Sequence, residues 1–401
     1  MNNSTDHRLA ILGGSAVLTK PSPAWPIFDE KDRQALNEVL ESRVWGGYHE
    51  AVGELERRFA AFHGTEYGIA LANGTVSLEI ALTSAGIRPG DEVIVPPITF
   101  VASATSVARV GAVPVFVDVD PETINLNPDL IQKSITERTR AIVAVHFAGH
   151  PVDLDRIVEL CDRHRLVLIE DCAHAHGAEW HEQHIGSFGS FGSFSFQASK
   201  NMTAGEGGML ITNDPVLAER ARSISNQGRQ TGGAWYEHQS LGTNARMTGF
   251  QAVLLLNQLE RLPNELATRM QRAKYLREAL IKNGGLLPTP AALDERVTVH
   301  GYHLFSMRYD SSVHVGLTRG RFIEALQAEG VPVTAGYPNP IYRNELFRKH
   351  PNVVTACPEA EAYCQSSIWL PHNALLADEQ WIDDVITAIN KVRNSVEDLI
   401  S

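Results

Sequence analysis

Residues 191–208, the stretch that decides the fold, have the sequence FGSFSFQASKNMTAGEGG. Its aromatic and apolar first part predicts a buried strand, which ends just before a single lysine, Lys200. A glycine-rich turn follows at residues 205–208, and residues 209–212 predict a second short strand. A lysine between two strands can form a Schiff base with an aldehyde if burial keeps its amine uncharged. Because most lysines lie on the surface, this interpretation needs support from the rest of the sequence.

Short apolar runs alternate with helical patterns before this stretch. We expect strands near residues 67–71, 92–95, 113–119, 141–147 and 166–170, and helices between them. This alternation predicts βαβ units and a mostly parallel buried sheet, so the fold class is α/β. From residue 248 a long helical pattern begins, which Pro263 should kink or break, and an α+β pattern follows. We therefore expect an N-terminal arm and large domain over residues 1–271 and a small domain over residues 272–401.

The composition is that of an ordinary globular protein with an acidic balance. A net charge of −12 and the lack of a basic tract argue against a nucleic-acid partner. No apolar run is long enough to span a bilayer, and residues 1–14 do not have the pattern of a signal peptide. The four cysteines, Cys161, Cys172, Cys357 and Cys364, lack CxxC spacing, so we expect reduced thiols and a cytoplasmic location.

Three further strand ends carry polar or aromatic residues, and ligands of open α/β sheets bind at that edge. Gly74 and Thr75 open a helix whose N-terminus can bind a phosphate, although Thr75 is also explained as a plain helix cap. Asp171 follows the fifth predicted strand and can hold a ring nitrogen protonated, or it can cap a turn. Phe100 can stack on a flat ring, although a lone phenylalanine is more often part of the core.

Cys172 and the nearby His174, His176, His181 and His184 raise the alternative of a metal site. Their spacing is not an established ligand pattern, so we expect no metal and place His174 beside an organic cofactor. We find no suitable GxGxxG after an early strand and no Walker lysine motif, which argues against nicotinamide and P-loop nucleotide sites. A lysine, a carboxylate, a stacking aromatic and a phosphate-binding helix start together favour pyridoxal phosphate.

The sequence resembles the DegT/StrS family of fold type I, pyridoxal-phosphate-dependent sugar aminotransferases over nearly its whole length. The segments that carry the resemblance are ALANGTVSLEIAL (70–82), DEVIVPPITFVASA (91–104), PVFVDVDPETINL (114–126), IEDCAHAHGA (169–178), FSFQASKNMTAGEGGML (194–210) and NARMTGFQAVLLLNQLERL (244–262). A last segment, CPEAEAYCQSSIWLPHNALL (357–376), resembles the branch of keto-cyclitol aminotransferases and aminohydroxybenzoate synthases. The resemblance implies a large domain with a mostly parallel central sheet and a smaller C-terminal α+β domain.

The resemblance also implies roles for single residues. It makes Lys200 the covalent attachment point of the cofactor and Asp171 the partner of the pyridinium nitrogen. The other implied cofactor contacts are Gly74, Thr75 and Ser199 at the phosphate, Phe100 on the ring face, His174 beside the ring and Asn244 at the phosphate of a neighbouring subunit. The implied assembly is therefore a homodimer with shared active sites. The implied substrate-pocket residues are Arg229, Tyr236, Tyr342 and His372.

Three positions depart from the family pattern, so the substrate of no single relative is transferred to this chain. Ala245 replaces an aromatic residue, Gly249 replaces an acidic one, and Pro263 interrupts a helix that relatives often continue. The implied function is transfer of an amino group from glutamate or glutamine to a nucleotide-linked keto-sugar or a keto-cyclitol in amino-sugar or antibiotic biosynthesis. Two alternatives stay open: a dehydratase or aromatising synthase, and a non-catalytic regulatory protein that binds pyridoxal phosphate. Lys200 argues against the dehydratases of the family, which have a histidine there.

Overall fold

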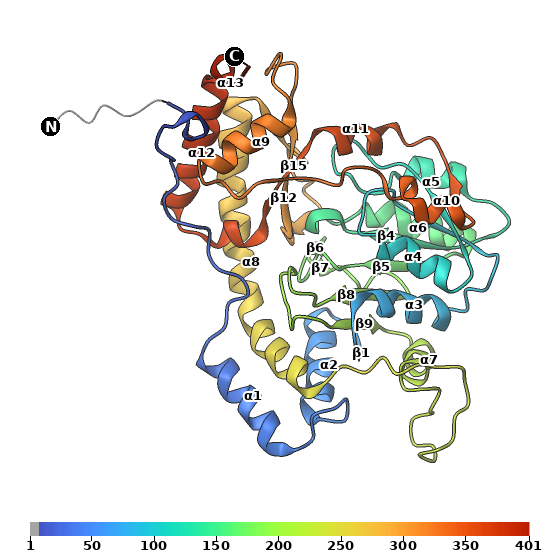
Figure 1. Ribbon diagram of the computed structural model, residues 1–401. Coiled ribbons are helices and arrows are strands. Elements are labelled where there is room, and N and C mark those ends of the chain that lie inside the picture. The colour runs from blue at the N-terminus through green and yellow to red at the C-terminus, as the bar shows by residue number, and fades with distance from the viewer. Residues whose placement is uncertain (1–7, 401) are drawn as a thin grey trace.

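The computed structural model describes residues 8–400, so residues 1–7 of the predicted N-terminal arm lie outside the described residues. Figure 1 shows two parts of the molecule: a large sheet together with its helices, and a smaller group of helices and strands. The long helix α8 (Gly249–Asn283) runs between them. This arrangement confirms the predicted α/β class with a second, smaller α+β part.

The large sheet has eight strands in the described chain, in the order β1-β9-β8-β5-β4-β2-β3-β14. Neighbouring strands from β8 to β14 are parallel, whereas β9 is antiparallel to both β1 and β8. The strands are β1 (Tyr67–Leu71), β2 (Glu92–Val95), β3 (Val113–Phe116), β4 (Thr139–Val145), β5 (Val167–Asp171), β8 (Phe191–Ser195), β9 (Gly208–Thr212) and β14 (Val353–Val354). Most of their side chains are buried because both faces are covered, which explains the continuous apolar runs in the sequence.

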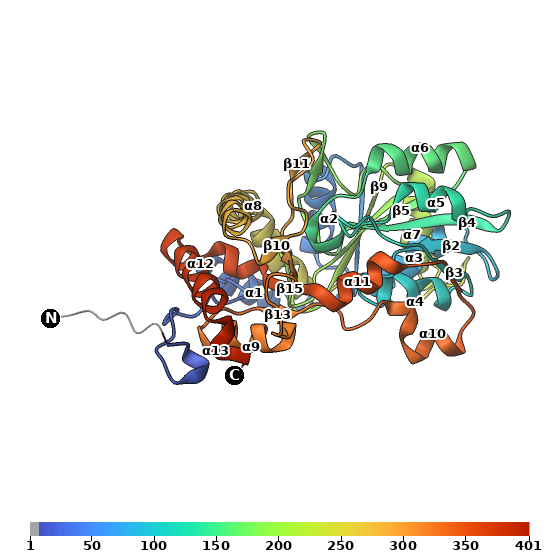
Figure 2. The ribbon, with the colours of Figure 1, turned by 90° about the horizontal axis from the view of Figure 1, so that it is seen from above.

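Helices cover both faces of this sheet (Figure 2). The first face packs against α2 (Glu50–Phe62), α5 (Pro128–Ser134), α6 (Leu154–His164) and the first half of α8. The second face packs against α3 (Gly74–Ser84), α4 (Ala102–Arg109) and α7 (Pro215–Ser225). An Asp or Asn side chain caps several helix starts, because its oxygen accepts a free N–H of the first turn. Among these caps are Asp29 of α1 (Glu30–Ser42), Asn73 of α3, Asn127 of α5, Asp153 of α6 and Asp214 of α7.

The smaller part contains an antiparallel sheet in the order β10-β12-β15-β13. Its elements are β10 (Leu286–Pro288), β12 (Leu304–Tyr309), β13 (Thr334–Ala335), β15 (Ser367–Pro371), α9 (Arg319–Ala328), α12 (Glu379–Asn394) and α13 (Val396–Ile400). The remaining elements are α10 (Glu345–Lys349), α11 (Pro358–Ser366), β6 (Glu179–Trp180), β7 (Gln183–His184), β11 (Val297–Val299) and the short 3₁₀ helices η1 (Ala10–Leu12), η2 (Phe147–Gly149), η3 (Ile341–Arg343) and η4 (His372–Leu376). Leu9 and Leu18 belong to the small core, so the N-terminal segment packs on the C-terminal part.

Helix α8 corrects one sequence expectation, because it continues through Pro263 for 35 residues without a break. A proline inside a helix costs about 3 kcal/mol, whereas each fully buried leucine contributes about 2 kcal/mol. Leu259, Leu262 and Leu266 are buried around the proline and outweigh that cost. Farther along, Ala273 belongs to the small core, so α8 supports both cores. No helix within residues 8–400 is long and apolar enough to cross a membrane.

The predicted division between residues 271 and 272 stays a prediction. It lies where the buried side chains of α8 pass from the large core to the small one. Two strands beyond it nevertheless pair with earlier parts of the chain, since β14 joins β3 and β11 joins β6.

Candidate active site

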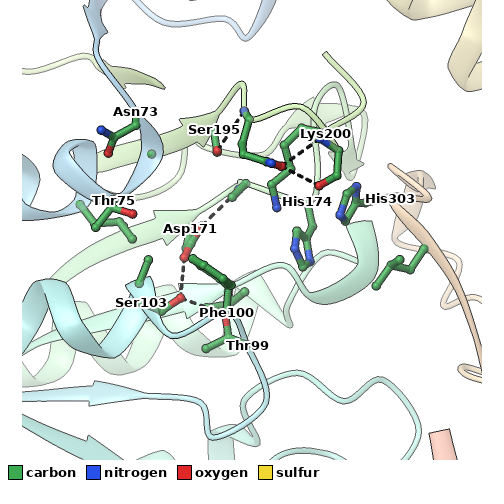
Figure 3. A pocket seen from close by; sticks show the side chains of 18 of the residues that line it. Asn73, Thr75, Thr99, Phe100, Ser103, Asp171, His174, Ser195, Lys200 and His303 are labelled. Atoms are coloured by element: carbon green, nitrogen blue, oxygen red, sulfur yellow. Dashed lines mark hydrogen bonds between the residues drawn. The ribbon is translucent and has the colours of Figure 1, made fainter. Parts of the chain in front are cut away.

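A cavity of about 960 Å³ lies at the carboxyl ends of the parallel strands, where residues of the small part close over them. Its large-domain wall comes from the ends of β1, β2, β4, β5 and β8, and its other wall from residues 303–304, 337 and 369–372. Figure 3 shows the side chains that meet there. The strand order therefore brings together residues that are more than a hundred positions apart in the sequence.

Lys200 lies in the turn that follows β8, and its backbone N–H donates to the carbonyl of Gln197. Its side chain lines the cavity and is buried, as the nucleophile hypothesis requires. Burial lowers the pKa of Lys200 to about 8, and the nearby Asp171 carboxylate opposes part of this shift. About a tenth of the amine is therefore uncharged at pH 7, far more than for a lysine with the ordinary pKa of 10.5.

Asp171 is the last residue of β5, and its buried carboxylate faces the same cavity (Figure 3). The carboxylate accepts hydrogen bonds from the Ser103 hydroxyl at 2.7 Å and the Ala173 N–H at 3.2 Å. Because Ser103 donates its proton to Asp171, the Thr99 hydroxyl at 2.9 Å must donate to Ser103. Burial raises the pKa of Asp171, while these hydrogen bonds and the charge of Lys200 oppose the increase. The result is an oriented acceptor for a positively charged N–H.

His174 lies beside His303, with ring centroids 4.3 Å apart. Burial, followed by the charge of Lys200, holds the pKa of His174 well below its usual range, so the ring is neutral. Its Nδ1 is buried and has no hydrogen-bond partner in the described chain. An unpartnered buried nitrogen that lines a cavity indicates a ligand or a water there.

The start of α3 is built for close approach to β8. A Cβ atom on Gly74 would lie 2.6 Å from the Cβ of Ser195, so only glycine fits between the two elements. The sequence had allowed Thr75 as the cap, but Asn73 caps α3 by accepting the N–H of Val76. Thr75 thus keeps its hydroxyl for the cavity, beside N–H groups that have no acceptor within the helix. This is a suitable site for a phosphate.

Ser199 and His372 meet at the lysine turn. The Ser199 hydroxyl and N–H both donate to the Gln197 side chain, and the Ser199 carbonyl accepts from His372 Nε2 at 3.1 Å. The direction of the last bond is fixed, because Arg269 can only donate and it contacts His372 Nδ1 at 3.3 Å. His372 therefore links α8 to the backbone next to Lys200.

Phe100 is 58% exposed and faces the cavity, in contrast to the buried Thr99 before it. An exposed aromatic ring at the end of β2 is not part of the core. Its ring is available to stack on a planar ligand.

Three predicted residues lie outside this cavity in the single chain. Arg229 lines a second cavity of about 410 Å³, and its guanidinium donates to the carbonyl of Trp235 and the side chain of Gln227. Tyr236 is 85% exposed and Asn244 is also exposed. Their predicted roles, Asn244 at the phosphate of a neighbouring subunit and Arg229 and Tyr236 in the substrate pocket, stay predictions.

Tyr342, a fourth predicted pocket residue, does not line the main cavity. Its hydroxyl donates to Glu361, and its ring packs near Phe116. A role in substrate binding stays a prediction for this tyrosine.

The sequence interpretation did not single out several residues that line the cavity. Ser103 follows Thr99 by four positions, so helical spacing could have linked it to the strand end. His303, Tyr337 and Trp369 come from the small part, where no local pattern marks them. Only the tertiary fold brings them to the lysine.

Cys172 does cluster with metal-ligand types, but with His146 and Glu170 rather than with the loop histidines. The Glu170 carboxylate already accepts the N–H groups of Gly186, Phe188 and Gly189. His146 Nδ1 accepts from Val152, so its other nitrogen carries the proton and donates to Glu170. These bonds form a closed structural network.

The residues around Lys200 fit pyridoxal phosphate. A flat phosphorylated aldehyde needs a buried lysine, an acceptor for its ring N–H, a stacking ring and an anion site, and each is present. The close contact at Gly74 and the unpartnered nitrogen of His174 support the fit independently of the lysine.

Comparisons with known proteins agree with this chemistry. The sequence model of the DegT/DnrJ/EryC1/StrS aminotransferase family matches residues 26–390. A relative from Streptoalloteichus tenebrarius, provisionally named L-glutamine:3-amino-2,3-dideoxy-scyllo-inosose aminotransferase, is 38% identical over 98% of this chain and 99% of its own. The L-glutamine:2-deoxy-scyllo-inosose aminotransferase of Micromonospora echinospora is 38% identical over 96% of this chain and 97% of its own.

Solved structures give the same result. The crystal structure of 3-amino-5-hydroxybenzoic acid synthase superimposes with a TM-score of 0.87 and 34% identity, covering 94% of this chain and 99% of the synthase. These similarities extend over nearly the whole chain and are not confined to the segments around the lysine.

Proposed function

The chain belongs to the DegT/DnrJ/EryC1/StrS aminotransferase family, and from this premise we propose that it moves the amino group of L-glutamine to the ketone of a free keto-cyclitol. As a member of this family it is an aminotransferase with pyridoxal 5′-phosphate as its cofactor. The relatives' names support the substrates, since both give L-glutamine as donor and a scyllo-inosose as acceptor. The structural observation that carries the proposal is the buried Lys200 beside the buried Asp171 in one cavity.

The proposed cofactor contacts follow from the cavity. Gly74 and Thr75, at the start of α3, and Ser199 would hold the phosphate. Phe100 would stack on the ring, and the neutral His174 would lie beside it. When bound, pyridoxal phosphate would supply the carrier that holds the amino group between donor and acceptor, so the two substrates would react in turn.

Lys200 and Asp171 divide the proton chemistry. Asp171 would keep the ring nitrogen protonated, because Ser103 and Ala173 hold its carboxylate in the cavity that also contains Lys200. Lys200, whose pKa is lowered to about 8, takes the proton from the α-carbon of the donor once its amine is uncharged. In the second half-reaction it returns a proton to the carbon of the acceptor that carries the new amino group.

The proposal includes a homodimer in which the neighbouring subunit supplies Asn244 to the phosphate and Arg229 and Tyr236 to the substrate. The exposure of Tyr236 and Asn244 in the single chain supports this assignment. A cytoplasmic location is also proposed, and four buried, unpaired cysteines support a reducing compartment.

A second candidate is an aromatising synthase, favoured by the similarity to 3-amino-5-hydroxybenzoic acid synthase. Lys200 fits both reactions, since each begins with proton removal by an uncharged amine. Loss of water from the product distinguishes them, because transamination leaves the ring hydroxyls in place. A regulatory protein that only binds the cofactor would show no spectral change with any donor.

The test is the visible absorbance of the purified protein with L-glutamine and L-glutamate added separately. We expect L-glutamine to bleach the cofactor band and a free keto-cyclitol to restore it. Restoration only by a nucleotide-linked keto-sugar would replace the proposed acceptor. A band that neither donor changes would contradict the transaminase assignment.

A further inference from the structure

We propose that Trp369 and Tyr337 form the acceptor subsite, where the indole face and a free phenol hold an uncharged polyhydroxylated ring. This inference rests on the proposed function and names the residues that select its acceptor. Both side chains belong to the small part and line the cavity that contains Lys200 and Asp171. Each is half-buried, so part of each ring is open to a ligand.

Trp369 is held rigidly. It lies on β15, an interior strand of the small sheet, and pairs with Ser306 on one side and Thr334 on the other. Its indole Nε1 donates to the hydroxyl of Tyr363 at 2.8 Å. Because that oxygen accepts from the indole, Tyr363 can give its own proton to Ser306 Oγ at 2.7 Å. These bonds fix the direction in which the indole face points.

Gly336 brings the next segment against the same indole. A Cβ atom at this position would lie 2.9 Å from Cε2 of Trp369 and 2.1 Å from Oγ of Ser367. Any larger residue would therefore displace the tryptophan or the strand. The sequence Gly336-Tyr337 thus packs the tyrosine against Trp369 at a defined angle.

Tyr337 contributes the polar half of the subsite. Its ring meets that of Trp369 edge to face, with centroids 4.9 Å apart and an interplanar angle of 89°. Among the described residues its hydroxyl has no hydrogen-bond partner, unlike the hydroxyls of Tyr363 and Tyr342. A cyclitol presents C–H groups on its ring face and hydroxyls around its edge. An aromatic face beside a free phenol matches both.

The charges that one chain places in the cavity favour an uncharged ring over a nucleotide-linked sugar. Within the described chain, Arg109 is at its rim and bonds the carboxylate of Glu79 at 2.6 Å. Lys200 serves the cofactor, and burial holds the pKa of His303 well below its usual range. The part of the subsite that one chain builds therefore contains no free positive charge for a diphosphate, so only the Arg229 proposed to come from the neighbouring subunit could contact one.

The experiment compares the two half-reactions in Y337F, W369F and the control Y275F, whose tyrosine is on the outer surface of α8. Bleaching by L-glutamine measures the first half-reaction, and recovery with 2-deoxy-scyllo-inosose measures the second. We expect Y337F to raise the KM for the cyclitol about fivefold, the value of one hydrogen bond. W369F should raise it about threefold by shrinking the aromatic face. Bleaching should stay within about twofold of wild type in all three variants.

Equal losses in both half-reactions would overturn the inference, because they would show a general structural defect. Unchanged cyclitol kinetics in Y337F and W369F would also overturn it, while leaving the proposed function intact. Failure of wild-type protein to react with L-glutamine or any keto-cyclitol would instead refute the proposed function. Calorimetric titration with scyllo-inositol, which has no ketone, then tests the subsite alone. Weaker binding in both variants than in wild type supports it, and equal or no binding refutes it.

Discussion

The cavity around Lys200 and the exposed segment of residues 226–246 differ in how far one chain completes them. In the cavity, Lys200, Asp171 and His174 are buried, and fixed donors orient the carboxylate. In the segment, Tyr236 is 85% exposed, and Arg229 bonds only to its own neighbourhood. The first region is organised before any partner arrives. In the second region, the side chains are proposed to act at the active site of a neighbouring subunit.

This difference shows which parts of an active site can be recognised in the structure of a single chain. Chemistry that depends on the carboxyl ends of parallel strands can be built from one sheet, since the fold brings those ends together. Chemistry supplied across a subunit boundary leaves only exposed side chains in the single chain. The following predictions test the two regions, beginning with the largest effect.

Lys200→Ala should abolish turnover, with a loss of at least about a thousandfold, because the covalent and proton-transfer roles both depend on this amine. The variant should still bind pyridoxamine phosphate, since the phosphate and ring contacts remain. Steady-state kinetics and fluorescence titration measure the two properties. Lys274→Ala, an exposed lysine of α8, is the matched control. Full turnover in the Lys200 variant would show that the cavity does not depend on this amine for catalysis.

Asp171→Asn should lower turnover about a hundredfold while keeping the cavity's shape, because an amide cannot hold the ring nitrogen protonated. Asp162→Asn, at an exposed position of α6, should match wild type. Single-turnover bleaching by L-glutamine measures the effect. A loss smaller than about threefold would mean that another group supports the ring nitrogen.

Asn244→Ala should lower turnover about tenfold if its side chain serves a neighbouring phosphate. This variant is then mixed with Lys200→Ala, and the subunits are allowed to exchange. Activity should rise to about a quarter of the wild-type value, because half of the dimers are mixed and each mixed dimer has one intact site of two. Recovery would show that the exposed segment acts on the other subunit. No recovery, with subunit exchange verified by mass, would place Asn244 in its own chain's site.

The smallest effect concerns pH. Lys200 has its pKa lowered from the ordinary 10.5 to about 8, so capture of pyridoxal phosphate by apo-protein should accelerate as the pH rises through about 8. The Asp171 carboxylate raises this pKa, so Asp171→Asn should move the midpoint to lower pH. Stopped-flow absorbance measures the capture rate. A midpoint near 10 would show that the lysine is solvated like a surface residue.

Much of the large-domain wall of the cavity, where the cofactor is proposed to bind, could be predicted from the sequence. Lys200 and Asp171 each follow an apolar run, and the rule for strand ends was enough to bring them together. The helix cap was harder, because Asn73 and Thr75 both suit the start of α3 and only backbone geometry distinguishes them. Pro263 misled the prediction, since tertiary packing outweighs a local helix preference.

The small-domain side could not be predicted in the same way. His372 was expected in the substrate pocket, but its hydrogen bonds depend on Arg269, a residue 103 positions away. Tyr337 and Trp369 come from different strand regions and meet only in the folded sheet. No periodicity links such residues, so the local sequence carries no signal for them.

Helix α8 has a consequence for how the two parts of the chain unfold. Its 35 residues span about 50 Å as one stiff element, beginning just after Asn244 and ending in the core that supports Trp369 and His372. Because its buried side chains belong to both cores, neither core can lose this helix while the other stays intact. The two parts of the chain should therefore unfold together in one transition and not one after the other.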